Sequence, residues 1–168
     1  MDKKRIVILS ALVIFFFCSL IPCHVLRIEA IRKNRPVFAH IVWPNDQFST
    51  KYIHSVELSP VREFFTIDKN FKIVLYETTF SSSNTGLPTT LSGDERLYTE
   101  GDHLRITNMY RVVPHLDLWV NEQYDNTLTL GNGKLLKLPS LAGDTLLRVF
   151  IEKMTFLEYI YVRAKIFT

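Results

Sequence analysis

Residues 48–67 read FSTKYIHSVELSPVREFFTI, and this stretch decides the fold class. Apolar side chains recur at every second position on both sides of Ser59-Pro60, which is the spacing at which residues of a β-strand share one face. They are Phe48, Tyr52, Val56 and Leu58 before the break, and Val61, Phe65 and Ile67 after it. The pattern predicts two antiparallel strands, 48–58 and 61–67, joined by a tight turn.

A turn centred on Ser59-Pro60 predicts the register of this hairpin. The predicted pairs are Leu58 with Val61, Glu57 with Arg62, Val56 with Glu63, and His54 with Phe65. In this register the two apolar faces coincide, and Glu57 and Arg62 are opposite charges on the outer face. A wider loop from Leu58 to Val61 with the same pairs satisfies the pattern equally well, because proline is disfavoured at the second central position of a type I turn.

His54 and Glu63 are polar residues on these apolar faces, and the predicted register makes them diagonal neighbours. A carboxylate on an apolar face needs a partner, because an unpaired buried charge is costly. Two interpretations stay open: the residues serve the structure, as a hydrogen-bonded pair or with Glu63 reaching solvent, or they belong to a binding or catalytic site. Ser55 is not placed to join His54 in a hydrolase triad, because adjacent strand residues point to opposite faces.

The rest of the chain after Arg35 repeats short alternating runs separated by Gly, Pro, Asn, Asp and Ser. Beyond the hairpin, the predicted strands are Lys72 to Phe80, His103 to Val113, Leu116 to Val120, Thr127 to Leu130, Lys134 to Leu138 and Thr145 to Lys153. The segment Gly131-Asn132-Gly133 is a hairpin turn, and Phe156 to Phe167 is ambiguous between helix and strand. The fold class predicted is all-β, an antiparallel sandwich or barrel of about eight strands.

The N-terminus reads as a membrane segment. Ile6 to Leu26 is a run of 21 residues without a charged side chain, and it follows the basic cluster Lys3, Lys4 and Arg5. A helix of that length spans a bilayer, and the basic cluster keeps its start in the cytoplasm. We therefore predict an anchor in residues 1–30 and a β domain in residues 36–168 that faces the periplasm or the cell exterior. The alternatives are a cleaved signal peptide and a lipoprotein acylated at Cys23.

Composition excludes several classes of function. Charged residues make up 22% of the chain and both signs are interleaved, which does not predict a nucleic-acid surface. Both cysteines lie in the N-terminal apolar run, so the predicted β domain has no disulfide and no thiolate ligand. The five histidines show no metal-ligand spacing, and no glycine-rich phosphate loop is present. We expect neither a metal nor a cofactor.

Several short motifs together resemble the domain-of-unknown-function family numbered eighteen-fifty, DUF1850. The motifs are Tyr52 to Glu57, Pro60 to Glu63, Gly86-Leu87-Pro88, Asn108 to Arg111 and Leu116 to Val120, and the likeness extends from about Trp43 to Ile151. The positions that carry over as candidate ligand-binding residues, without assigned roles, are His54, Ser55, Glu57, Glu63, Gly86, Leu87, Pro88 and Arg111. We expect the Gly86-Leu87-Pro88 loop to fold near His54 and Glu63 and to form one wall of a small polar pocket.

The resemblance also implies a cellular context. Members of this family are membrane-anchored extracytoplasmic proteins, often encoded beside TRAP-type transporters of the TAXI class, which import small organic anions. The leading hypothesis is therefore a non-enzymatic accessory or binding module at the outer membrane face, with transporter subunits as partners. The alternatives are an envelope structural or adhesion module, and an extracytoplasmic enzyme that uses His54 as a general base and Glu63 as its orienting carboxylate.

Overall fold

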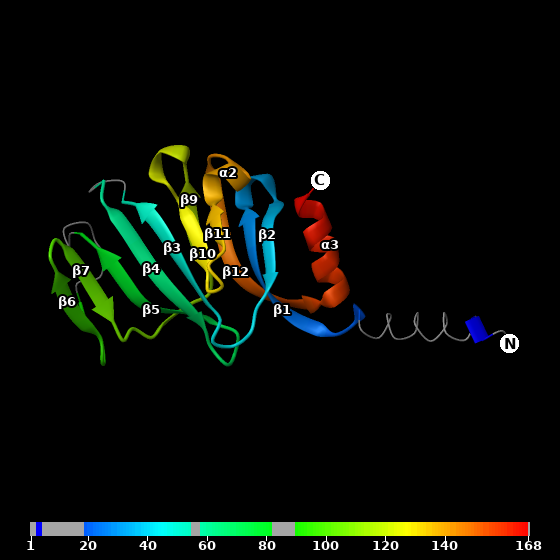
Figure 1. Cartoon of the computed structure of the whole chain (residues 1–168), viewed down its shortest axis with the longest axis horizontal. Helices are drawn as coiled ribbons and strands as arrows, with labels where there is room; N and C mark the ends of the chain where they lie inside the picture. The colour runs from blue at the N-terminus through cyan, green and yellow to red at the C-terminus, as the bar shows by residue number, and fades with distance from the viewer. Residues whose placement is uncertain (1–2, 5–18, 55–57, 82–89, 168) are drawn as a thin grey trace.

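A computed structural model describes residues 3–4, 19–54, 58–81 and 90–167 of the chain. In these residues the chain forms two antiparallel sheets that enclose a common core, as expected for an all-β sandwich (Figure 1). The smaller sheet has the order β2-β1-β12-β9, with β1 Pro22–Ala30, β2 Arg35–Ile41, β12 Thr145–Thr155 and β9 Leu116–Val120.

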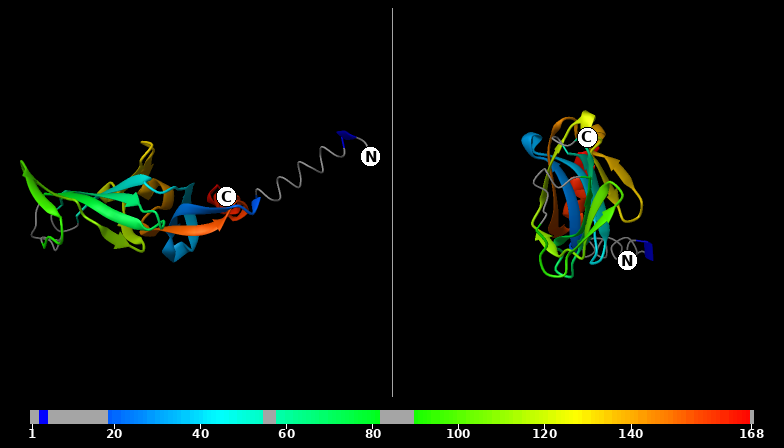
Figure 2. Two further views of the ribbon diagram at one scale, coloured as in Figure 1. Left: turned by 90° about the horizontal axis from the view of Figure 1, so that it is seen from below. Right: turned by 90° about the vertical axis from the view of Figure 1, so that its left-hand side faces the viewer.

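The larger sheet has the order β11-β10-β3-β4-β5-β7-β6, and β8 pairs with β5. Its strands are β3 Gln47–Ile53, β4 Pro60–Ile67, β5 Ile73–Phe80, β6 Arg96–Glu100, β7 His103–Thr107, β8 Arg111–Val113, β10 Thr127–Leu130 and β11 Leu135–Lys137. The helices are the 3-10 turns η1 Ile31–Lys33 and η2 Glu122–Tyr124, the short α2 Leu138–Ala142, and α3 Phe156–Ile166. α3 and the start of β1 lie at one end of the molecule, and β6 and β7 at the other (Figures 1 and 2).

The first hairpin has a different register from the predicted one. Arg62 lies opposite Lys51 and Glu63 lies opposite Thr50, so the pairing is shifted by six residues and the predicted Glu57–Arg62 pair is wrong. The shift is even, so the apolar faces still coincide, and Phe48 stacks on Phe65 with ring centroids 4.9 Å apart.

The loop of the hairpin explains the shift. β3 ends at Ile53, and the connection is closed by backbone bonds from the His54 amide to the Ser59 carbonyl and from the Leu58 amide to the His54 carbonyl. Leu58 is 70% exposed, so its apolar side chain belongs to the loop and not to the core. Pro60 is the first residue of β4, a position where the missing amide is tolerated.

Other predicted strands are confirmed with altered limits. The hairpin at Gly131 forms as predicted, with Gly133 at φ +84° and the Leu130 amide donating to the Lys134 carbonyl. The predicted strand His103 to Val113 is divided into β7 and β8, because Asn108 adopts φ +58° and turns the chain. Twelve strands occur in the described residues, more than the eight predicted, because the predicted set lacks β1, β2, β6 and the division of β7 from β8.

The predicted boundary between anchor and domain is also wrong. Pro22–Ala30, assigned to the anchor, is an inner strand of the smaller sheet, in which Val25, Leu26 and Ile28 are at most 1% exposed. The folded domain therefore begins at Pro22 and not at residue 36. Residues 5–18 lie outside the described part of the chain, and within the described part no helix has the length and apolar character needed to cross a bilayer.

The ambiguous C-terminal segment is the helix α3. Its first turn carries a capping box, in which the Thr155 hydroxyl accepts from the Glu158 amide and the Glu158 carboxylate accepts from the Thr155 amide. Tyr159 on its inner face packs with Val25, Ala39 and Met154. The helix therefore covers the edge of the smaller sheet formed by β1 and β2.

The placement of β1 gives a direct test. Leu26→Ala should lower the free energy of unfolding of the full chain in detergent by about 2–5 kcal/mol, because it opens a cavity in the core. Ile21→Ala, at a position 55% exposed, should change it by less than about 0.5 kcal/mol. Urea denaturation followed by near-ultraviolet circular dichroism measures both. Equal, small effects would place Leu26 outside the core.

Candidate functional site

A row of basic residues crosses the larger sheet. Successive ladder pairs join Lys137, Thr127, Lys51, Arg62, Thr79 and Arg105 through β11, β10, β3, β4, β5 and β7. Four of these six residues are basic and two are threonines, and we call the six together the basic row. The next row contains Leu128, Thr50, Glu63, Thr78 and Ile106, and all of these except Glu63 are at most 2% exposed. Because neighbouring rows point to opposite faces, the basic row lies on the outer face.

The charges in the basic row are unequally compensated. The Lys51 Nζ lies 2.8 Å from Asp125 Oδ2, which lowers the pKa of the Asp125 carboxyl. Arg105 pairs with Glu77 at 2.9 Å and with Glu100 at 3.3 Å. Arg62 lies directly opposite Lys51, and no carboxylate of the described residues is within 4 Å of its guanidinium. Two like charges face each other across adjacent strands, an arrangement that costs stability.

Two hollows flank this pair of cations. The larger, of ≈ 480 Å³, is lined by Lys51, Arg62, His103 and Arg105 among others, with the half-buried Ile53 contributing an apolar surface. The smaller, of ≈ 250 Å³, extends the other way toward Lys137 and is also lined by Lys51 and Arg62. The two cations therefore separate two concave surfaces and are accessible from both.

The predicted diagonal pairing of His54 and Glu63 is wrong. His54 lies beyond the end of β3, opposite Ser59, and Glu63 is four residues further along β4, about 13 Å away at 3.3 Å per residue. Glu63 instead lies between the buried Thr50 and Thr78, and the Thr50 hydroxyl donates a long 3.4 Å hydrogen bond to its carboxylate. Burial raises the pKa of Glu63, and the Thr50 bond opposes that shift only in part.

Arg111 holds a loop in place. It makes a two-pronged contact with Glu95, with Nε to Oε1 and Nη2 to Oε2 both at 2.7 Å, and the Ser92 amide donates to the same carboxylate at 3.0 Å. The Glu95 side chain is only 3% exposed, and these bonds lower its pKa to about 2. The guanidinium predicted to bind a ligand is thus occupied by a carboxylate of the chain. Ser55, Glu57, Gly86, Leu87 and Pro88 lie outside the described residues.

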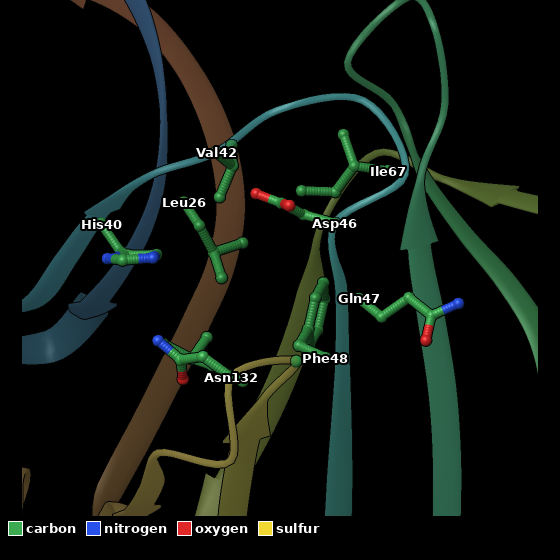
Figure 3. A pocket seen from close by; sticks show the side chains of 10 residues that line it. Leu26, His40, Val42, Asp46, Gln47, Phe48, Ile67 and Asn132 are labelled. Atoms are coloured by element: carbon green, nitrogen blue, oxygen red, sulfur yellow. The ribbon is translucent and has the colours of Figure 1, made fainter.

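A third hollow, of ≈ 230 Å³, lies at the margin between the two sheets (Figure 3). His40, Asp46 and Asn132 border it above an apolar floor that includes Leu26 and Phe48, while Gln47 points away. Asp46 is already used by the chain turn, since its Oδ2 accepts from the Trp43 amide at 2.8 Å. Burial lowers the pKa of His40, which favours the neutral imidazole. This hollow offers fewer free charges than the basic row.

The family model described as "Domain of unknown function (DUF1850)" matches residues 48–136, more than half of the 168-residue chain. The chain belongs to the DUF1850 family. No curated protein and no solved structure matches the chain.

The DUF1850 segment coincides with most of the larger sheet. It includes Lys51, Arg62 and Arg105, together with both partners of the Arg111–Glu95 pair. β1, β2, β12 and α3 lie outside it. No group of three or more potential metal-binding side chains occurs in the described part of this DUF1850 chain. The basic side chains Lys51, Arg62 and Arg105 of this segment belong to chemical classes that bind carboxylate and phosphate groups.

Replacement of Glu63 tests whether its charge is compensated. A carboxyl whose pKa is raised by folding favours the folded state at low pH, and this contribution is lost as the pH rises through the folded value. Glu63→Gln should therefore raise the melting temperature at pH 8 and leave it nearly unchanged at pH 4. The exposed Glu122→Gln is the control. A lower melting temperature for Glu63→Gln at both pH values would reveal a compensating partner.

The Arg111–Glu95 pair predicts the opposite dependence on pH. Because the Glu95 pKa is about 2 in the folded protein, the pair contributes stability above about pH 4.5 that is lost as the pH falls toward 2. Arg111→Gln should cost about 3 kcal/mol at pH 7, since it leaves a buried charge unpaired. The matched control is Arg148→Gln, whose two 2.7 Å bonds to Asp117 are exposed and are worth about 0–1 kcal/mol. Equal losses in the two variants would contradict this account.

Proposed function

We propose that the protein is a membrane-anchored extracytoplasmic binding module that holds a small anion against Lys51 and Arg62. The observation that carries the proposal is the apposition of these two like charges on the outer face, with no carboxylate of the described residues paired to Arg62. Asp125 compensates only the Lys51 side of this like-charge pair, and a bound anion adds an attraction to both cations.

The geometry suits a carboxylate or a dicarboxylate. Neighbouring strands are about 4.8 Å apart, so one anionic group reaches both Lys51 and Arg62. A second anionic group would lie two strands away beside Arg105, where it would share the guanidinium with Glu77 and Glu100. A guanidinium binds a carboxylate through two parallel bonds, and an ammonium adds a point charge. His103 and Ile53 line the same hollow and supply further polar and apolar contacts.

The tether is part of this proposal. With β1 beginning at Pro22, the uncharged stretch available to a membrane segment is Ile6 to Ile21, behind Lys3, Lys4 and Arg5. Sixteen helical residues are about 24 Å long, and flanking basic side chains extend the reach by snorkelling. The basic cluster orients the domain toward the periplasm or cell exterior.

The proposed partner is a TAXI-class TRAP transporter, which the family resemblance supports because such transporters import small organic anions. A tether raises the local concentration of the domain beside a membrane partner, so weak binding suffices. The enzyme alternative depended on contact between His54 and Glu63, which the observed register separates. The envelope structural alternative predicts no anion-dependent effect on the protein.

Anion binding is tested on the full chain in detergent. Succinate, glutarate and inorganic phosphate are titrated by calorimetry and by thermal shift at low and high salt, because a bound ligand stabilises the folded state. We expect saturable binding that weakens with salt and falls about tenfold or more in Arg62→Gln, the cost of one charged hydrogen bond. Arg32→Gln, which removes the same charge from η1, should bind like the wild type.

Two results would contradict the proposal in different ways. Absence of saturable binding for every anion, or unchanged affinity in Arg62→Gln, removes the anion site. The partner is tested separately by cross-linking and affinity purification from native membranes of the source cell, where we expect transporter subunits to be recovered. Repeated failure to recover any transporter subunit removes the partner and leaves the anion site standing.

A further inference from the structure

The helix α3 is apolar on its outer face as well as on its inner face. Tyr159, Val162 and Ile166 pack against the smaller sheet. On the opposite side Leu157 is 53%, Ile160 48% and Tyr161 60% exposed. The spacing i, i+3 and i+4 places these three side chains on one stripe. A helix that is apolar on two opposite faces is normally covered on both, and within the described residues nothing covers this stripe.

The stripe is continuous with the N-terminal end of the folded domain. The Phe156 amide donates to the Ile21 carbonyl at 3.0 Å, which joins the start of α3 to the residues that precede β1. Leu20 and Ile21 are 49% and 55% exposed, and Phe156 is 39% exposed. The uncharged segment Ile6 to Ile21 therefore enters the domain directly beside the exposed stripe. Any bilayer that holds this segment lies next to α3.

The other side chains of α3 suit a lipid surface. Arg163 and Lys165 are its basic residues, and both contact aromatic rings: Lys165 Nζ lies 4.5 Å from the Tyr161 ring centroid, and the Arg163 guanidinium 5.9 Å from that of Phe167. Glu158, the acidic residue of the helix, is used by the capping box. Aromatic and basic side chains beside an apolar stripe are typical of helices that lie in the membrane interface.

We propose that α3 lies on the membrane, with Leu157, Ile160 and Tyr161 inserted at the boundary between headgroups and acyl chains, and with Arg163 and Lys165 against anionic headgroups. This proposal rests on the membrane tether of the proposed function. It adds a second contact that fixes the orientation of the domain, because α3 packs against β2. The strands β6 and β7, which lie at the end of the molecule opposite α3 (Figure 1), are then far from the bilayer.

The test measures the depth of a tryptophan in lipid vesicles. In the full chain with Trp43→Phe and Trp119→Phe, the reporter is Tyr161→Trp and the matched control is Tyr98→Trp, an exposed position on β6 at the other end of the molecule. Both proteins are reconstituted into vesicles of phosphatidylcholine and phosphatidylglycerol whose acyl chains are brominated near the headgroup. Flotation in a density gradient reports whether the chain is anchored.

We expect both proteins to float, and the tryptophan at position 161 to lose at least half of its fluorescence to the brominated lipid, while that at position 98 is unchanged. Replacing Leu157 and Ile160 by serine should restore the fluorescence at position 161. Flotation without quenching at position 161 overturns the α3 contact and leaves the tether intact. If a dimer that forms with rising protein concentration protects the stripe from quenching, the α3 contact with lipid is likewise overturned and the tether is unaffected. Failure to float overturns the tether and the α3 contact together, but does not affect anion binding measured in detergent.

Discussion

The pairing of β3 with β4 is the constraint on which the site depends. Phe48 is paired with Phe65 and stacked on it in the core, and a shift by one residue would turn every core side chain of the hairpin to the outer face. The same register places Lys51 beside Arg62 on the outer face and Glu63 beside Thr50 on the inner face. Pairing with β10 and β5 extends both rows across the sheet, so the register of this hairpin determines where the cations gather.

The sequence predicts which side chains of this hairpin share a face, but not how the strands are aligned. Alternation has a period of two, so registers that differ by an even number of residues fit the apolar pattern equally well. The loop geometry around Leu58, at φ +50°, selects among them, and Ser59-Pro60 alone does not reveal it. The sequence hides β1 for another reason: Val25 and Leu26 belong to the uncharged run from Ile6 to Leu26, and only Ile28 lies beyond Arg27, which ends that run.

The residues of the candidate site could not be predicted from the sequence for the same reason, because the alignment and order of the strands bring them together. Arg105 and Arg111 are both arginines of predicted strands and cannot be told apart in the sequence. In the structure Arg105 lies in the basic row, whereas Arg111 forms an ion pair with Glu95, sixteen residues earlier. The basic row itself joins residues as distant as Lys51 and Lys137, which only the order of the strands brings together. The proposed picture is a domain tethered and steadied at its α3 end, with fixed cations exposed on the larger sheet for an anion.

The side-chain Nε–H signals of the arginines test the central claim most directly. In a titration of the ¹⁵N-labelled full chain in detergent with succinate, followed by nuclear magnetic resonance, we predict that the Arg62 signal shifts along a saturable curve, and that the Lys51 ammonium responds with the same midpoint. The Arg148 signal, whose guanidinium is paired with Asp117, should remain in place. Small, linear shifts of all arginine signals without saturation would show that Lys51 and Arg62 attract anions only as ordinary surface charges, and would contradict the proposed site.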